Sequence, residues 1–249
     1  MAGHSKWANI KHQKAKADAK KGKLFTKLIR AIMVAAKKGS DPNANPQLRD
    51  AVKEALNANM TRDVVDRAIK RGSGEMDGAN MMEEIMYEGY GPGGVAIMVE
   101  CLTDNRNRTV AEVRHAFTKH GGNLGTDGSV AYLFKKSGLL VYSSSCDENK
   151  MMEVALEAGA EDIKVNEDGS FDVLTAPEHF VTVKEFMVQS GLNPEQAEIT
   201  FLPDNYVKLE KEQAETMMKL QDKLEDLDDV QNVYSNAEIA DDIFDELMG

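Results

Sequence analysis

The chain has 249 residues, of which 42% are hydrophobic and 29% are charged, and this excludes a collagen-like or wholly disordered protein. No apolar run approaches the roughly 20 residues of a membrane-spanning helix, and the amino terminus lacks the apolar core of a secretory signal. The only cysteines, Cys101 and Cys146, form no CxxC pair, which excludes a disulfide scaffold and a cysteine-based zinc site. We therefore expect a cytoplasmic protein with no membrane partner.

The net charge of −12 conceals a strong asymmetry along the chain. Residues 1–75 carry 17 Lys and Arg against 7 Asp and Glu, a net of +10. The remaining residues carry 13 basic and 35 acidic side chains, a net of −22. Such a division predicts one end that binds a polyanion and an acidic body that remains soluble.

Residues 1–23 are rich in Lys and Ala and poor in apolar residues, which predicts a mobile arm that orders on a partner. Three short amphipathic helices follow. The first has an apolar stripe from residue 24 to 36, the second begins with Asn45 as cap and Pro46 in its first turn, and the third runs from Thr61 to Gly72. These helices predict a small helical domain, and the polar, glycine-containing stretch after it predicts a linker.

The chain after residue 80 alternates between strand and helix periodicity. We expect a strand at 95–102, a helix at 109–120 and a strand at 130–134. A compact β-α-β-β-α-β series follows, with the order of a ferredoxin-like unit. Its predicted elements are strand 139–142, helix 147–158, strands 162–165 and 171–174, helix 177–190 and strand 197–202. A strand at 206–209, a helix and a strand at 230–234 then complete a second, split ferredoxin-like unit.

The predicted fold is therefore α+β, with a small N-terminal helical domain and two ferredoxin-like domains, the second inserted into the first. The basic arm is predicted at residues 1–23 and the helical domain at residues 24–75. The split α+β domain is predicted at residues 80–136 with 205–240, and the inserted α+β domain at residues 137–204. Cys101 falls on the apolar face of a central strand, so we expect a buried, unreactive thiol.

Several motifs that could carry chemistry have simpler interpretations. Gly89, Gly91 and Gly94 satisfy GxGxxG, but the segment precedes a strand and contains Pro92, so a tight turn is favoured over phosphate binding. The five histidines lack zinc-ligand spacing. The acidic runs 225–229 and 241–246 lack calcium-loop spacing and are interpreted as solvated faces. We expect no catalytic constellation, no metal site and no cofactor.

Two segments remain as candidate sites. The polar loop after strand 95–102 lies where a helix N-terminus favours anions, and equally fits ordinary helix capping by Asn107 or Thr109. Its candidate functional residues are Asp104, Asn105, Arg106 and Arg108. In the arm, lysines bind phosphates as point charges and Trp7 can stack on a base. The candidate nucleic-acid-binding residues are His4, Ser5, Lys6, Trp7, Lys11, Lys14, Lys16, Lys20, Lys21, Lys23 and Lys27.

Four sequence blocks resemble the YebC/PmpR family, whose mitochondrial relative is the translational activator of cytochrome c oxidase subunit I. They are residues 3–11, 87–94, 100–109 and 121–130, the last interrupted at 126–127. The resemblance implies three domains, a cytoplasmic location and no enzymatic activity. Members of the family are described as DNA-binding transcriptional regulators and as ribosome-associated factors that aid translation through proline-rich stretches.

These observations predict a non-enzymatic, monomeric, nucleic-acid-binding regulator of gene expression. The resemblance favours a DNA-binding transcriptional regulator. The alternative is a factor that binds ribosomal RNA or the ribosome, because no predicted helix shows an Arg, Asn and Gln face for reading the major groove. A protein-binding adaptor and an enzyme using the loop 104–108 are the competing classes.

Overall fold

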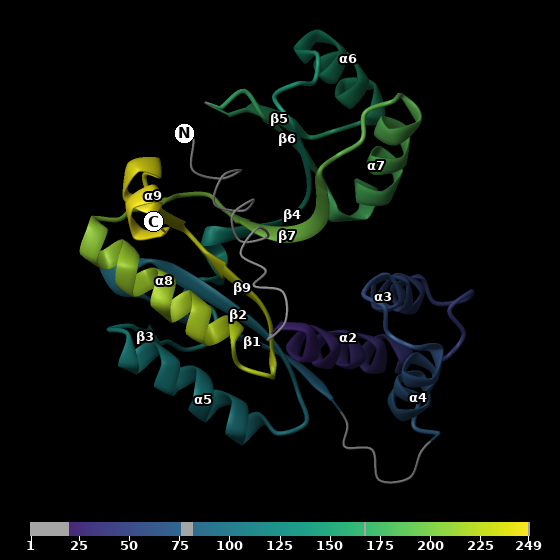
Figure 1. Ribbon diagram of the computed structural model, residues 1–249, viewed down its shortest axis with the longest axis vertical. Helices are drawn as coiled ribbons and strands as arrows, with labels where there is room; N and C mark the ends of the chain where they lie inside the picture. The colour runs from purple at the N-terminus through teal and green to yellow at the C-terminus, as the bar shows by residue number, and fades with distance from the viewer. Residues whose placement is uncertain (1–19, 76–81, 167, 249) are drawn as a thin grey trace. The chain divides into compact units, whose positions relative to one another are not determined.

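The protein is described by a computed structural model that covers residues 20–75, 82–166 and 168–248 (Figure 1). The α-helices are α2 (Lys20–Ala36), α3 (Pro46–Asn57), α4 (Arg62–Gly72), α5 (Arg106–Lys119), α6 (Glu148–Ala158), α7 (Phe180–Gln189), α8 (Lys211–Glu225) and α9 (Asp241–Met248). Among the described residues, no helix combines the length and apolarity that a membrane span requires.

The three helices predicted near the amino terminus are confirmed. Asn45 links two of them, because its side-chain oxygen accepts from Leu48 N at 3.1 Å while its side-chain nitrogen donates to Ala35 O and Gly39 O at 2.8 Å. One residue thus begins α3 and holds the end of α2 against it. The core between the helices contains Leu28, Ile32, Ala35, Ala36, Leu48, Ala51, Ala55, Met60, Val65 and Ala68.

The first four-stranded sheet has the order β3-β1-β2-β9 and every neighbouring pair is antiparallel. Its strands are β1 (Glu83–Tyr90), β2 (Ala96–Thr103), β3 (Asn123–Leu124) and β9 (Val230–Ser235). The helices α5 and α8 lie on one face (Figure 1), where Phe117 of α5 approaches Gly89 and Met217 of α8 approaches Gly91. The Cys101 thiol is fully buried, as predicted, and burial raises its pKa to about 12.

The second four-stranded sheet has the order β5-β6-β4-β7, again antiparallel throughout. Its strands are β4 (Phe134–Tyr142), β5 (Asp162–Val165), β6 (Phe171–Thr175) and β7 (Gln196–Pro203). With α6 after β4 and α7 after β6, this is the ferredoxin-like arrangement that the sequence predicts. Its core includes Tyr142, Met151, Phe180 and Met187, which join the sheet to both helices.

Several predicted strands and boundaries are wrong. The strand β1 is missing from the prediction, because its glutamates at 83, 84 and 88 obscure the alternation. The glycine-containing segment after it is a turn, as predicted, formed by a short 3-10 helix at Pro92–Gly94 between two paired strands. The helix expected at 109–120 begins earlier, at Arg106, with Asn105 as its cap.

The strand predicted at 130–134 does not form. A 3-10 helix occupies Ala131–Leu133 and β4 begins at Phe134. The backbone N–H groups of Val130 and Ala131 donate to the carboxylate of Glu88 rather than to a neighbouring strand. The expected strand at 206–209 is reduced to β8 (Val207–Lys208), which pairs with β10 (Ala237–Glu238) in a separate parallel ladder.

Within the described residues the chain forms two compact units. The larger unit consists of residues 20–131 and 212–235, and the smaller unit of residues 132–211 and 236–248. The larger unit contains α2–α4 and the first sheet, and the smaller unit contains the second sheet. The division of the larger unit into a helical and an α+β domain stays a prediction.

Candidate functional site

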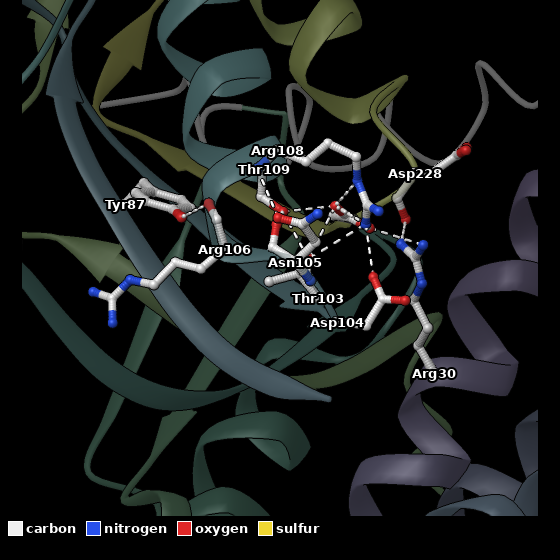
Figure 2. A network of polar contacts seen from close by, with 10 residues as sticks. Arg30, Tyr87, Thr103, Asp104, Asn105, Arg106, Arg108, Thr109 and Asp228 are labelled. Atoms are coloured by element: carbon white, nitrogen blue, oxygen red, sulfur yellow. Dashed lines mark hydrogen bonds and ion pairs between the residues drawn. The ribbon is translucent and has the colours of Figure 1, made fainter. Parts of the chain in front are cut away.

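A cluster of polar contacts in the larger unit is centred on Asp229, in the segment between α8 and β9. Figure 2 shows the residues around it, among them Arg30, Arg108 and Thr109. The side chain of Asp229 is only 1% exposed. The backbone carbonyl of Asp229 accepts from Leu102 N at 2.8 Å, which fixes the segment to the end of β2. A buried carboxylate is tolerated only when it is paired and hydrogen-bonded, and Asp229 meets both conditions.

An arginine from α2 supplies one of the two cations. The Nη2 atom of Arg30 lies 2.8 Å from Asp229 Oδ1, and its Nη1 atom donates to the backbone carbonyl of Asp228. Arg30 is largely buried, with a side chain 16% exposed. This contact joins the helical region to the first sheet through a charge pair rather than through apolar packing alone.

The second cation comes from the predicted loop. Arg108 Nη2 lies 2.8 Å from Asp229 Oδ2 and 3.0 Å from Oδ1, and it also donates to Asp104 Oδ1 at 2.9 Å. Thr109 donates its hydroxyl to Asp229 Oδ2 at 2.6 Å, and Thr103 lies 3.1 Å from the same oxygen. Both carboxylate oxygens are therefore fully satisfied.

These partners set the ionisation of the cluster. Burial alone would raise the pKa of Asp229, but the hydrogen bonds from Thr109 and Arg108 and the charge of Arg30 together lower it. The hydrogen bonds that Arg108 donates to Asp229 and Asp104 raise the pKa of its guanidinium group. Asp229 is thus a permanently charged centre at neutral pH.

A second buried carboxylate of the same sheet holds a loop. Glu88 is 7% exposed and accepts from Gly128 N at 2.7 Å, Val130 N at 2.8 Å and Ala131 N at 2.7 Å. These three backbone donors outweigh the desolvation of the carboxylate and lower its pKa. Glu88 thereby fixes the loop 125–131 to β1.

The structure brings together three of the four predicted loop residues. Asn105 caps α5 by accepting from Arg108 N at 3.1 Å, so neither Asn107 nor Thr109 is the cap. Asp104 pairs with Arg108. Figure 2 shows the Arg106 side chain pointing away from the cluster, while the hydroxyl of Tyr87 donates to its carbonyl at 3.4 Å. A binding role for this loop stays a prediction.

Most of the predicted arm residues lie outside the described residues. These are His4, Ser5, Lys6, Trp7, Lys11, Lys14 and Lys16. Lys20, Lys21 and Lys23 belong to the first turns of α2, whose side chains are not described. Lys27 is partly buried, and its ammonium donates to Gln231 O at 3.4 Å, a contact that attaches α2 to β9.

In the sequence, Asp229 lies within the acidic run 225–229, which predicts a solvated face. That interpretation is wrong for this residue, because its partners lie more than 100 positions away in the chain. Arg30 was equally inconspicuous among the many cations of the basic region. Among the described residues, no three His, Cys, Asp or Glu side chains are arranged to hold a metal ion.

Two family models match almost the whole chain. The model described as "TACO1/YebC protein N-terminal domain" matches residues 5–75, and "TACO1/YebC second and third domain" matches residues 82–237. The chain belongs to the TACO1/YebC family. Arg30 lies in the region that matches the N-terminal-domain model, and Asp229 lies in the region that matches the second-and-third-domain model. Their ion pair therefore joins regions that belong to two different family models.

Individual relatives agree with this assignment. The chain is 63% identical to a protein of Methylococcus capsulatus over 99% of its own length and 100% of that protein, and 60% identical to one of Idiomarina loihiensis over 99% of both chains. Both are named "probable transcriptional regulatory protein". A crystal structure of a conserved hypothetical protein from Aquifex aeolicus matches with a TM-score of 0.82 at 49% identity, covering 95% of this chain and 98% of that one.

Proposed function

We propose that this TACO1/YebC protein is a non-enzymatic, nucleic-acid-binding regulator of gene expression that acts as a DNA-binding transcriptional regulator. The observation that carries the proposal is the division of charge, +10 over residues 1–75 and −22 over the rest. A basic segment on an acidic body concentrates the attraction for phosphates at one end. The names of the relatives support a regulatory role.

The described part of the basic region contributes exposed cations beyond α2. They are Arg49, Lys53, Arg62, Arg67, Lys70 and Arg71, on α3 and α4. By contrast, Lys27 and Arg30 of α2 donate to Gln231 O and Asp228 O, and Lys37, which follows α2, donates to Met82 O. These three cations thus stabilise the larger unit, and those of α3 and α4 are candidates for phosphate contact.

The second candidate is a factor that binds ribosomal RNA or the ribosome and assists elongation through proline-rich sequences. The composition of α4 favours it, because Asp63 and Asp66 lie on the same exposed face as Arg62, Arg67 and Lys70. A face of mixed charge suits backbone and shape recognition better than reading base edges in a major groove.

Salt-dependent titration tests the proposal and separates its two forms. The full chain is titrated with a DNA duplex and with a structured RNA at several salt concentrations. Lys11→Ala should weaken binding to every sequence and lower the salt slope by about one unit. Trp7→Ala should leave the slope unchanged and cost roughly 1–3 kcal/mol if the indole stacks on a base. Lys164→Ala, an exposed lysine of the smaller unit, is the matched control.

The same proposal states that the protein is not an enzyme, and that it is a monomer in the cytoplasm. Arg106→Ala tests the competing enzyme hypothesis, because this exposed side chain lies outside the Asp229 cluster. Nucleic-acid affinity and regulation in cells should both survive the substitution. Loss of regulation with unchanged affinity would point to chemistry at the loop instead.

A further inference from the structure

A cavity of about 210 Å³ lies between the helical region and the first sheet of the larger unit. Ala31 and Val34 of α2, Ala51 of α3 and Leu102 of β2 form its apolar lining. This volume is many times the roughly 10–15 Å³ that a single water needs on the same measure. It is therefore large enough for a small organic molecule and too large for a single ion.

Two carboxylates line the same cavity. In the β1–β2 register Glu84 pairs with Leu102 and Met86 pairs with Glu100, so both glutamates project from one face at diagonal positions. Diagonal neighbours in an antiparallel pair are roughly 7–8 Å apart, which leaves room for one ligand to reach both. This face is opposite the one that α5 and α8 cover, because Gly89 alternates with Glu84 and Glu88 along β1.

The two carboxylates have different surroundings. Glu100 Oε2 accepts from the side-chain nitrogen of Asn232 at 2.8 Å and from the hydroxyl of Tyr234 at 2.9 Å, which fixes the group in place. Glu84 is exposed and has no hydrogen-bond or ion-pair partner among the described residues. The cavity thus has one held carboxylate and one available carboxylate.

The remaining polar atoms are amides. The side-chain nitrogen of Gln231 is buried without a hydrogen-bond partner among the described residues. Rotating the side-chain amide of Gln231 by half a turn exchanges its oxygen and nitrogen. The oxygen would then occupy the buried position and could accept from a bound cation. Lys38 donates to Gln47 Oε1 at 3.1 Å and Lys27 to Gln231 O, so both neighbouring ammonium groups contact oxygens, and no Lys or Arg lines the cavity.

We infer that this cavity binds a linear aliphatic diamine, with one ammonium group at Glu84, the other at Glu100, and the methylene chain against Ala31, Val34, Ala51 and Leu102. Two carboxylates separated by an apolar lining match two cations separated by methylenes. Because α2 and α3 supply one wall and the sheet supplies the other, the bound diamine stabilises the contact between the helical region and the sheet.

Calorimetric titration of the full chain, purified free of nucleic acid, with cadaverine tests the inference. Glu84→Gln and Glu100→Gln should each raise the Kd about tenfold, since each removes a charge-assisted contact. Glu83→Gln makes the same change of charge on the same strand but on the opposite face, and should leave the Kd unchanged. Ala51→Leu should abolish binding by filling the cavity, and melting temperatures without ligand confirm that each variant folds.

Four outcomes would overturn the inference. The first is an absence of cadaverine binding, and the second is an equal effect of Glu83→Gln, which would indicate diffuse attraction to the acidic surface. The third is equal competition by MgCl₂, which would show that charge alone is recognised. Titration with Nα-acetyl-lysine amide separates a free diamine from a lysine side chain of a partner protein, and tighter binding of this probe than of cadaverine would overturn the diamine assignment. Since no nucleic acid is present, the result is independent of the proposed regulatory function.

Discussion

The two sheets differ in their strand order and in the path that the chain takes between their strands. In the second sheet β4 is followed by α6, a hairpin of β5 and β6, α7 and β7, whereas in the first sheet the hairpin of β1 and β2 comes before α5. Both arrangements are four-stranded, antiparallel and associated with two helices. The comparison shows that the same layered packing tolerates a change in connectivity, because the sheet and its apolar face determine what is buried.

A buried carboxylate lies beside or within each sheet, and the pKa values of the two carboxylates are shifted in opposite directions. Asp229, beside the first sheet, contacts two arginines and two threonines, and its pKa is lowered. Asp172 of β6 is 4% exposed, its Oδ1 atom has no hydrogen-bond partner among the described residues, and burial raises its pKa. Two buried carboxylates therefore have pKa values shifted in opposite directions, and the hydrogen-bond and charge partners of each carboxylate decide the direction.

The largest effect should come from Asp229→Asn, which leaves Arg30 and Arg108 without their buried counter-charge. Breaking a buried ion pair costs about 3–5 kcal/mol of unfolding free energy, and the lower end is expected here because Arg108 is 42% exposed and keeps Asp104 as a partner. Urea unfolding followed by circular dichroism measures the loss, and amide exchange in β9 assigns it to the larger unit. Asp228→Asn is the control, because Arg30 contacts only the backbone carbonyl of that exposed residue. Equal losses in both variants would contradict the central role of Asp229.

The dependence on pH follows from the same carboxylates. The folded pKa values of Asp229 and Glu88 are lowered, so their stabilisation is complete above the unfolded values, about 3.9 and 4.3. It is lost as the pH falls through the lower folded values. The stability difference between wild type and Asp229→Asn should therefore shrink below about pH 4. A difference that stays constant down to pH 2 would contradict the lowered pKa of Asp229.

A smaller and more local effect is expected from Glu88→Gln. The neutral amide accepts three backbone N–H groups less well than the carboxylate, and the cost should be about 1–3 kcal/mol. Amide exchange should accelerate at Gly128, Val130 and Ala131 before it changes elsewhere in the larger unit. Glu84→Gln, on the same face of β1 but exposed, should leave these amides protected.

The smallest effect should come from Asp172→Asn. Since the folded pKa of Asp172 is raised, its ionisation opposes folding above the unfolded value, and removing the charge relieves that cost. We expect the unfolding free energy at neutral pH to stay constant or rise by up to about 1 kcal/mol. Thermal unfolding of the two variants side by side completes the comparison. If Asp172→Asn lowered the unfolding free energy as much as Asp229→Asn, the ionised forms of the two aspartates would not have opposite effects on stability.

Most of the helices and the complete second sheet could be predicted, because their apolar residues recur at helical or strand spacing and their ends have caps and turns. The strand β1 could not, because one of its glutamates, Glu88, is buried by contacts with a loop some 40 residues later. The false strand at 130–134 has the same origin, since Val130 and Ala131 bond to that glutamate.

The candidate site divides in the same way. Sequence alone identified the polar loop 104–108 and the basic region, because unusual composition is visible in one dimension. It could not show that Arg108 and Arg30 meet at Asp229, because a carboxylate within an acidic run has no local sign of burial.

By itself the sequence determined the α+β class, the ferredoxin-like order of the second sheet and the division of charge, since periodicity and composition are local properties of the chain. Tertiary structure alone decided which charged residues are buried and what they bind. Asp229, Glu88 and Lys27 resemble their exposed neighbours in sequence, and only contacts over long separations distinguish them. The physical reason is that the cost of burying a charge depends on the groups that surround it in space.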